Sequence, residues 1–207
     1  MRFPERGLYA ITQTKNKSGD TIINEVIAAI RGGAAVVQYR DKNPADALFL
    51  ARELVKICHR HKVPLVINDD VELAAMVGAD GVHIGKEDAA IAQARKRLGN
   101  DAIIGVSCYN FVERALDAEG QGATYVAFGR FFPSSSKPLA APAKIETLQQ
   151  AKLVLNIPIV AIGGILPENA AQLLAAGADL LAVIGGLFDN QPEQSARAYQ
   201  TLFHSHF

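Results

Sequence analysis

The segment QYRDK, residues 38–42, carries polar groups at every second position. Alternate residues of an extended chain point to the same side, so Gln38, Arg40 and Lys42 would share one face. Guanidinium and ammonium groups are common protein partners of phosphate oxygens. The segment therefore predicts an anion-binding strand end. The alternative is a solvated face with exposed salt bridges.

Two carboxylates follow neighbouring apolar runs. Asp69 comes directly after Asn68, and Asp88 lies three residues beyond Gly85. One or two carboxylates, completed by water and substrate phosphate, are the usual protein ligands of Mg²⁺. The alternatives are a helix N-cap for Asn68 and Asp69 and a first-turn acid for Asp88. Asp70, directly before a helical pattern, is better explained as an N-cap.

Glycines and serines later in the chain suggest a second anion site. The segment RFFPSSSKP, residues 130–138, carries three serines and Lys137, and the segments AIGGI and VIGG supply glycines. Glycine lets backbone N–H groups approach a phosphate closely. We therefore expect two phosphate-bearing ligands, one bound with a metal and one bound by backbone. The alternatives are an ordinary polar loop and glycines that only make tight turns.

The remaining reactive side chains favour structural roles. His83 lies within the apolar run GVHIG, where a hydrogen-bonded core histidine is preferred over a catalytic base. Cys58 and Cys108 are too few and too far apart for a disulfide framework or a zinc site. No convincing Ser-His-Asp or Cys-His arrangement stands out.

Eight short, β-branched runs must position these residues. They cover residues 8–12, 35–40, 64–68, 81–85, 102–107, 125–129, 158–163 and 180–185. Amphipathic stretches such as 44–61, 87–99 and 167–177 lie between them. Strands that alternate with helices and are apolar throughout predict a parallel sheet covered on both faces.

A weak internal repeat favours closure of that sheet. Gly-Ala pairs precede every second predicted strand, at residues 33–34, 78–79, 122–123 and 177–178. Glycine suits a left-handed helix end. The pattern predicts an α/β fold, a (β/α)8 TIM barrel formed as a single domain by residues 1–207. In such barrels the C-terminal strand ends build the active site. The rival is an open doubly wound sheet, but its GxGxxG motif does not follow the first strand.

Composition excludes several classes of protein. The 207 residues include 21 basic and 21 acidic side chains, so no basic surplus indicates a nucleic-acid partner. No uninterrupted apolar run reaches the roughly 18 residues of a membrane span. The first ten residues, MRFPERGLYA, lack the apolar core of a signal peptide. We expect a cytoplasmic protein.

These motifs, in this order, resemble the thiamine-phosphate synthase family. They are QYRDK (38–42), ND (68–69), ADGVHIGKED (79–88), GVS (105–107), FFPSSSKP (131–138) and AIGGI (161–165). The resemblance runs almost the full length and implies an α/β barrel transferase of thiamine biosynthesis. Such an enzyme joins 4-amino-5-hydroxymethyl-2-methylpyrimidine diphosphate to 4-methyl-5-(2-phosphooxyethyl)thiazole. Its partners would be these two small phosphorylated substrates, and a homo-oligomer is compatible with the resemblance.

The resemblance also implies roles for individual residues. The pyrimidine diphosphate would be bound by Gln38, Tyr39, Arg40, Asp41, Lys42, Asn68, Ser107 and Lys137. The thiazole phosphate would be bound by Ser134, Ser135, Ser136, Gly164, Ile184 and Gly185. Asp69 and Asp88 would hold one Mg²⁺ per subunit, and the catalytic residues Arg40, Lys42 and Lys137 would stabilise the leaving diphosphate. Strand alternation alone would turn Asp41 away from this face.

Two positions depart from the family pattern. Arg130 stands where the family often has proline, and Gly185 stands where many members have serine. Three alternatives stay open: a thiazole tautomerase, a sugar-phosphate isomerase or epimerase, and a non-catalytic phosphate-binding regulator. A tautomerase would not need the diphosphate site that these motifs imply, and a non-catalytic regulator would not need the metal carboxylates. An isomerase or epimerase would need a paired acid and base or a His-rich metal site.

Overall fold

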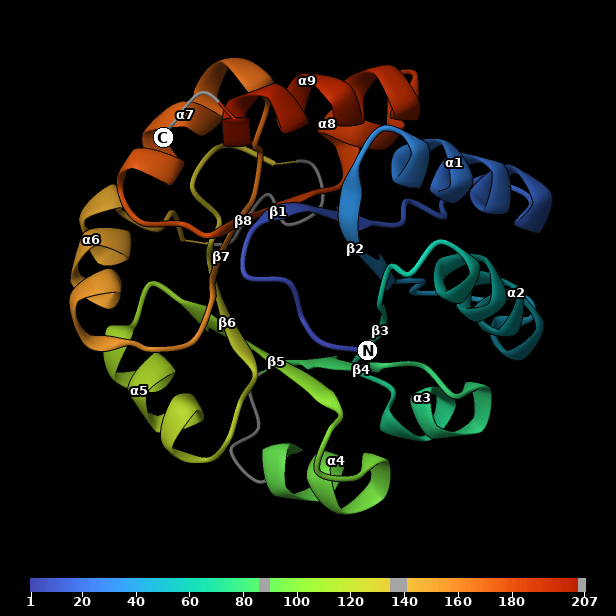
Figure 1. The fold of residues 1–207 in the computed structure, drawn as a ribbon, viewed down its shortest axis with the longest axis horizontal. Coiled ribbons are helices and arrows are strands. Elements are labelled where there is room, and N and C mark those ends of the chain that lie inside the picture. Colours follow the sequence, from blue (N-terminus) through green and yellow to red (C-terminus); the bar gives the residue numbers. More distant parts are fainter. Residues whose placement is uncertain (86–89, 135–140, 205–207) are drawn as a thin grey trace.

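Eight parallel strands close into a barrel in which each strand pairs with its neighbours in sequence. The computed structural model describes residues 1–85, 90–134 and 141–204. The strands are β1 (Gly7–Ile11), β2 (Ala34–Tyr39), β3 (Leu65–Asn68), β4 (Gly81–Ile84), β5 (Ile103–Tyr109), β6 (Tyr125–Gly129), β7 (Ile159–Ile162) and β8 (Leu180–Val183). The predicted (β/α)8 barrel is confirmed, and Figure 1 shows its strands as an inner ring.

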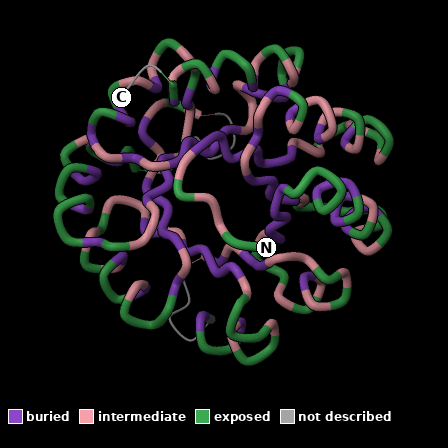
Figure 2. Tube along the Cα trace, in the orientation of Figure 1, coloured by how far each residue is buried: buried purple, intermediate pink, exposed green. Residues whose placement is uncertain are grey.

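Helices surround this ring (Figure 1). They are α1 (Gly19–Arg31), α2 (Ala47–Arg60), α3 (Val71–Val77), α4 (Ala90–Leu98), α5 (Val112–Gly120), α6 (Ile145–Val154), α7 (Pro167–Ala175), α8 (Gly185–Phe188) and α9 (Pro192–His204). The strands are buried and the outer helix faces are exposed, as Figure 2 shows. Within the described residues, no helix is both long and apolar enough to cross a lipid bilayer.

Side-chain alternation along the strands divides the core into an inner and an outer part. The barrel interior is filled by Tyr9, Ile11, Val36, Val66, Ile103, Tyr125, Ala127, Val160, Leu180 and Ala182. Two further apolar clusters lie between the strands and the helices. Both faces of the strands are therefore buried, as their continuous apolar sequences predict.

The four Gly-Ala pairs end helices at the N-terminal side of the barrel. Gly33, Gly78, Gly122 and Gly177 all have positive φ, between 69° and 109°. After three of them, the next N–H donates to a carbonyl five residues back: Ala79 to Ala74, Ala123 to Ala118, and Ala178 to Leu173. This is the hydrogen bond of a Schellman helix end. The repeat thus has the role that the sequence predicted.

The residue after each pair extends the repeat. The Asp80 carboxylate accepts a hydrogen bond from Leu65 N–H at 2.9 Å, and the Asp179 carboxylate accepts one from Ile159 N–H at 2.9 Å. Thr124 Oγ1 accepts from Ile104 N–H at 3.0 Å. Each side chain therefore satisfies an N–H group near the start of the preceding strand. Ala35, after the first pair, has no polar group for this.

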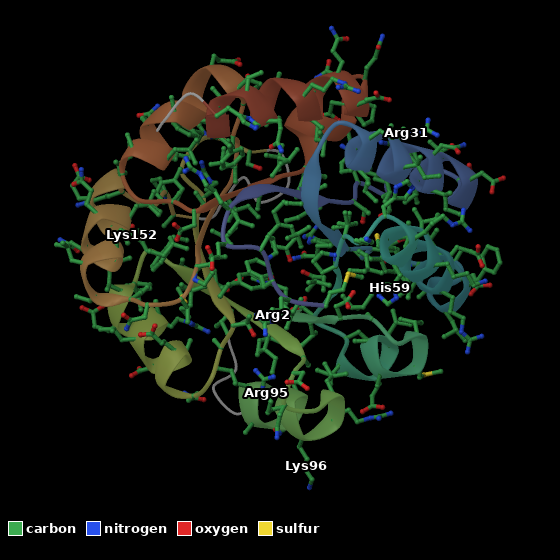
Figure 3. All side chains as sticks on the ribbon, in the orientation of Figure 1. Arg2, Arg31, His59, Arg95, Lys96 and Lys152 are labelled. Atoms are coloured by element: carbon green, nitrogen blue, oxygen red, sulfur yellow. The ribbon has the colours of Figure 1, made fainter. Side chains whose placement is uncertain are left out.

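We call the N-terminal strand ends, with the segments that cover them, the barrel floor. The N-terminal segment crosses the opening inside the ring (Figure 1), and Phe3 stacks on Tyr125 with ring centroids 4.1 Å apart. Arg95 of α4, labelled in Figure 3, donates to the carbonyls of Asn100 and Ala102 at 2.7 Å. The floor is closed and internally hydrogen-bonded, and the opposite end of the barrel, its mouth, is left for a ligand.

Candidate active site

A cavity of about 270 Å³ opens at the mouth of the barrel. Eight residues of the two predicted anion sites line it: Gln38, Arg40, Asn68, Ser107, Ser134, Gly164, Ile184 and Gly185. They come from strands or loops on several sides of the barrel. The structure therefore brings both predicted sites into one cavity, at the end of the barrel where such active sites are built.

Other predicted residues lie elsewhere. The Tyr39 side chain is packed between β2 and the outer helices, because alternation turns it away from Gln38. Asp41 accepts a hydrogen bond from Asn43 N–H at 3.0 Å, and Lys42 is exposed; neither lines the described part of the cavity. Four predicted residues lie outside the described residues: Asp88, Ser135, Ser136 and Lys137.

Thr12 holds the end of β2 in place. Its Oγ1 accepts a hydrogen bond from Arg40 N–H at 2.9 Å and donates to the Arg40 carbonyl at 3.1 Å. Thr12 N–H donates to the Gln38 carbonyl at 3.0 Å, and its side chain is 2% exposed. The extended backbone thus continues past Tyr39, so that Arg40 lines the same cavity as Gln38. Sequence reasoning missed Thr12, although a polar residue ending an apolar strand was the available signal.

Asp69 and Asp70 are adjacent but serve different ends. Asp69 has φ of 62°, its N–H donates to the His83 carbonyl at 2.8 Å, and its Oδ2 accepts from Asn68 Nδ2 at 2.7 Å. A Cβ added to Gly85 would lie 3.8 Å from Asp69 Oδ1, so this exposed carboxylate stands between the ends of β3 and β4. Asp70 instead accepts from Leu73 N–H at 2.8 Å, which confirms the predicted N-cap.

The Asp69 carboxylate suits a hard cation. It is exposed but does not line the described part of the cavity, and Asn68 donates to one of its two oxygens. In the described part of the chain, no group of three or more His, Cys, Asp or Glu side chains could enclose a metal by itself. One or two carboxylates completed by water and phosphate oxygens are the usual protein ligands of Mg²⁺, and Asp69 has the chemistry for one of them.

The glycines after β7 leave room for the loop that follows β6 to pack against them. Gly163 and Gly164 have φ of 104° and 63°, and an added Cβ would overlap Arg130 or the Pro133 carbonyl, respectively. Phe132 N–H donates to the Gly163 carbonyl at 3.0 Å. Arg130 and Ser134 are thereby brought to the cavity. Arg130, unexplained by the sequence, is therefore a cavity residue.

Glycines after β8 continue the lining that begins with Gly163 and Gly164, and we call these residues together the glycine wall. Gly185 begins the short helix α8, and a Cβ added to it would lie 2.5 Å from Asp189 Oδ2. The other carboxylate oxygen of Asp189 accepts from Gln13 Nε2 at 2.8 Å. Many members of the resembled family have a serine at this position. Here Asp189 leaves little room for a side chain at Gly185. The donors left to this wall are backbone N–H groups.

A chain of five polar side chains crosses the barrel interior. Gln38 Nε2 donates to the Tyr9 hydroxyl at 2.9 Å, and the Tyr9 and Tyr125 hydroxyls are 2.7 Å apart. The Tyr125 hydroxyl lies 2.9 Å from His83 Nδ1, and His83 Nε2 lies 2.9 Å from Ser107 Oγ. We call these residues the interior chain. All five also line the cavity, so the interior chain forms its base.

Burial shapes the chemistry of the interior chain. Tyr125, Tyr9 and Gln38 are 0%, 1% and 2% exposed. Burial raises the pKa of the Tyr9 and Tyr125 phenols well above the ordinary value for tyrosine, so both keep their protons. His83 is hydrogen-bonded through both ring nitrogens, as the preferred structural role predicts, and it is half-buried and also lines the cavity.

The comparisons with known proteins agree on one family. A sequence model described as thiamine monophosphate synthase matches residues 8–187. The thiamine-phosphate synthase of Nitrosococcus oceani is 50% identical over 204 residues, covering 98% of this chain and 93% of that protein. The thiamine-phosphate synthase of Methylococcus capsulatus is 50% identical over 206 residues, with 98% and 92% coverage.

Solved structures add to this similarity. The thiamine phosphate pyrophosphorylase from Pyrococcus furiosus matches with a TM-score of 0.87 and 31% identity, covering 97% of this chain and 96% of that one. A geranylgeranylglyceryl phosphate synthase from Thermoplasma acidophilum has a TM-score of 0.70 at 15% identity, with 95% and 92% coverage. At that identity the second likeness concerns the fold alone.

Proposed function

This chain belongs to the thiamine monophosphate synthase family, and we propose that it is a transferase that makes thiamine phosphate. It joins 4-amino-5-hydroxymethyl-2-methylpyrimidine diphosphate to 4-methyl-5-(2-phosphooxyethyl)thiazole and releases diphosphate. The observation that carries the proposal is a single cavity with a cationic wall and a glycine wall, lined by Arg40 on one side and by Gly164 and Gly185 on the other. Two phosphorylated substrates need two such walls.

The cationic wall suits the pyrimidine diphosphate. Arg40 offers a planar guanidinium for two phosphate oxygens, while Gln38, Asn68 and Ser107 offer hydrogen bonds to the rest of the substrate. Lys42 is exposed near the rim and Lys137 is proposed from the family resemblance alone. These cations would stabilise the charge that gathers on the leaving diphosphate.

The glycine wall suits the thiazole phosphate. Gly164 and Gly185 follow β7 and β8, the part of a barrel that frequently binds phosphate. Backbone N–H groups there, together with the Ser134 hydroxyl, would donate to the phosphate oxygens. Arg130, which lines the same cavity, is a further candidate contact for this phosphate.

Asp69 is the proposed protein ligand of one Mg²⁺ per subunit, with Asp88 as its partner from the family resemblance. The exposed position of the Asp69 carboxylate between β3 and β4 supports this role. When bound, the ion supplies Lewis-acid stabilisation of the diphosphate oxygens. Asn68 would orient the carboxylate through the hydrogen bond to Asp69 Oδ2.

The reaction needs no nucleophile from the protein. The C–O bond to the diphosphate breaks with its electron pair on oxygen, and the thiazole nitrogen supplies the pair for the new C–N bond. The electron-rich aminopyrimidine can carry the positive charge between these events. His83 and Ser107 are hydrogen-bonded, but the other nitrogen of His83 faces the Tyr125 hydroxyl where a Ser-His-Asp triad has a carboxylate. The role of Ser107 is therefore binding.

The thiochrome assay tests this function. Purified protein is given both substrates with Mg²⁺, and thiamine phosphate is oxidised to fluorescent thiochrome. We expect product only when both substrates and Mg²⁺ are present, with a sample containing excess EDTA as the control. No Mg²⁺-dependent product would sink the synthase proposal. Isomerisation of a thiazole phosphate without the pyrimidine would favour the tautomerase, and ligand binding without turnover would favour the regulator.

A further inference from the structure

The interior chain connects two residues that face the proposed pyrimidine site from different strands. Gln38 belongs to β2 and Ser107 to β5, and Tyr9, Tyr125 and His83 bridge them through contacts of 2.7–2.9 Å. The floor and outer helices hold many other hydrogen bonds, but these end on backbone or at the surface. The interior chain instead begins and ends at the cavity.

Each hydroxyl in the chain has one proton, so the direction of donation can be followed. Gln38 Nε2 can only donate, so the Tyr9 oxygen accepts and the Tyr9 proton goes to Tyr125. The Tyr125 proton then goes to Nδ1 of His83, whose Nε2–H donates to Ser107 Oγ. The three bridging residues therefore donate in one direction, from Gln38 toward Ser107.

The opposite direction leaves a buried group unsatisfied. If Tyr125 donated to Tyr9, the Tyr9 proton would face only Gln38 Nε2, which is itself a donor. A buried donor without an acceptor is costly. With the amide of Gln38 in this orientation, its oxygen Oε1 is the group left to accept from a ligand, and the Ser107 hydroxyl is left with its proton to donate. The two ends of the chain therefore have opposite hydrogen-bonding character.

We propose that Tyr9, Tyr125 and His83 are positioning residues that set Gln38 as an acceptor and Ser107 as a donor for the aminopyrimidine ring. This inference rests on the proposed synthase function and deepens it. An aminopyrimidine carries a donor amino group and acceptor ring nitrogens. Gln38 Oε1 accepts from the amino group, and the Ser107 hydroxyl donates to a ring nitrogen. The diphosphate is held separately, by Arg40.

Packing beneath the cavity keeps the interior chain in register. A Cβ added to Gly105 would overlap the Tyr125 ring and hydroxyl, so glycine at this inward position of β5 admits the tyrosine. Phe3 stacks on the same ring at 4.1 Å from the floor side. Gly105 and Ser107 point to the same side of β5, because they are two residues apart. Gly105 leaves room for Tyr125 at the centre of the interior chain, and Ser107 is the last residue of that chain.

The Tyr125→Phe variant tests the proposal, because it keeps the ring and removes the hydroxyl shared by Tyr9 and His83. We expect the KM for the pyrimidine diphosphate to rise about tenfold, the effect of one lost hydrogen bond to the ring. The KM for the thiazole phosphate stays within about twofold. Inhibition by inorganic diphosphate with Mg²⁺ is unchanged, because that probe has no ring.

Tyr199→Phe is the matched control. It removes another buried phenol hydroxyl, which donates to the Ile165 carbonyl at 2.9 Å behind the glycine wall. The variant is expected not to raise the KM for the pyrimidine diphosphate. An equal rise of that KM in both variants would show general loosening of the barrel and overturn the proposal.

The remaining outcomes separate this inference from the function on which it rests. A wild-type protein that makes no thiamine phosphate refutes the synthase function itself. An active wild type whose Tyr125→Phe variant keeps its pyrimidine KM, or weakens diphosphate inhibition equally, refutes the positioning role. If Tyr125→Phe does not fold, Tyr9→Phe breaks the chain one link earlier and must give the same KM split. In a background that already carries both Gln38→Ala and Ser107→Ala, the tyrosine variant should add no further rise.

Discussion

The floor and the mouth of this barrel are built from the same eight strands but follow different rules. At the floor one device recurs, in which Asp80, Thr124 and Asp179 each follow a Gly-Ala pair and accept a strand N–H. In the described part of the mouth, glycine pairs follow β7 and β8, but no single device serves alternate units around the barrel. Arg40 and Gly164, for example, are cavity residues of unrelated type at equivalent strand ends.

The difference follows from what each end must satisfy. Strand starts expose N–H groups that need an acceptor, and the alternate strands β3, β5 and β7 meet this need in the same way. The mouth must instead fit two unlike ligands. Asp69 and Tyr109 adopt left-handed φ of 62° and 56° there, and Lys62 does so with 59° before β3, so such backbone strain occurs at both ends. The floor is therefore where we expect stability to be lost by mutation, and the mouth where we expect activity to be lost.

The largest effect is expected at Asp69. Asp69→Asn should lower kcat/KM on the order of 100-fold and raise the Mg²⁺ concentration needed for half-maximal rate, because one charged ligand is lost. The melting temperature should hardly change, since this carboxylate is exposed. Asp70→Asn is the control, because asparagine caps α3 as well as aspartate does. Equal losses in the two variants would mean that the rim carboxylates act only on the helix.

Gly164→Ala should damage the glycine wall selectively. The added methyl group would overlap the Pro133 carbonyl, and φ of 63° disfavours alanine. We expect the KM for the thiazole phosphate to rise about tenfold, with a smaller change for the pyrimidine diphosphate. Gly120→Ala is the control, because its added Cβ meets nothing within 4 Å. Steady-state kinetics with each substrate varied in turn measure both KM values. An equal rise of the two KM values would contradict a selective role of Gly164 in binding the thiazole phosphate.

Asp80→Asn should test the floor through stability. Burial alone would raise the pKa of Asp80, but hydrogen bonds from the Met1 amino group, Leu65 N–H and His59 outweigh it and lower that pKa. A lowered folded-state pKa stabilises the protein above the unfolded pKa of about 3.9, and the benefit is lost as pH falls through the folded value. We expect a loss of about 1–2 kcal/mol at pH 7.

Urea denaturation at several pH values measures this effect. The difference between wild type and Asp80→Asn should shrink as the pH falls below about 4. Thiamine phosphate formation at pH 7 should stay close to the wild-type rate. A difference in stability that persists unchanged in acid would show that the charge of Asp80 is not what stabilises the floor.

Thr124→Val should have a smaller effect on the floor. The variant removes the hydroxyl that accepts from Ile104 N–H at 3.0 Å, at an expected cost of about 1 kcal/mol in the free energy of unfolding. Thr124→Ser keeps the hydroxyl and serves as the control. If the serine variant loses as much stability as the valine variant, the methyl group rather than the hydrogen bond is what matters at this position.

The smallest effect on activity is expected at Tyr39, because its side chain lies on the outer face of β2, away from the cavity. Its hydroxyl is buried without a hydrogen-bond partner among the described residues, so Tyr39→Phe should not destabilise the protein and should raise the free energy of unfolding by up to about 1 kcal/mol. The KM for the pyrimidine diphosphate should stay at its wild-type value. Thermal unfolding and the two-substrate assay measure both. A raised pyrimidine KM would restore Tyr39 to the binding residues that the family resemblance implied.

Much of the floor and part of the mouth could be predicted from the sequence. The spacing of apolar runs and of the Gly-Ala pairs predicted the eight units, because both patterns are set by local backbone geometry. The alternation in QYRDK predicted that Gln38 and Arg40 share a face, and the structure has both at the cavity. It also separates Asp41 from them, which the family resemblance alone did not. Lys42 continues the alternation but is exposed, because β2 ends at Tyr39.

The sequence by itself determined which residues share a face of each strand, and only the tertiary structure decided which face is inward and which residues meet. Alternation is a local property of each strand, so it says nothing of a contact between Tyr9 and Tyr125. Their hydroxyls lie 2.7 Å apart although 116 positions separate them in the chain. That distance depends on the closure of the barrel and on the space left by Gly105. The interior chain therefore forms only when the barrel closes, whereas its two end residues, Gln38 and Ser107, were predicted from the sequence as binding residues.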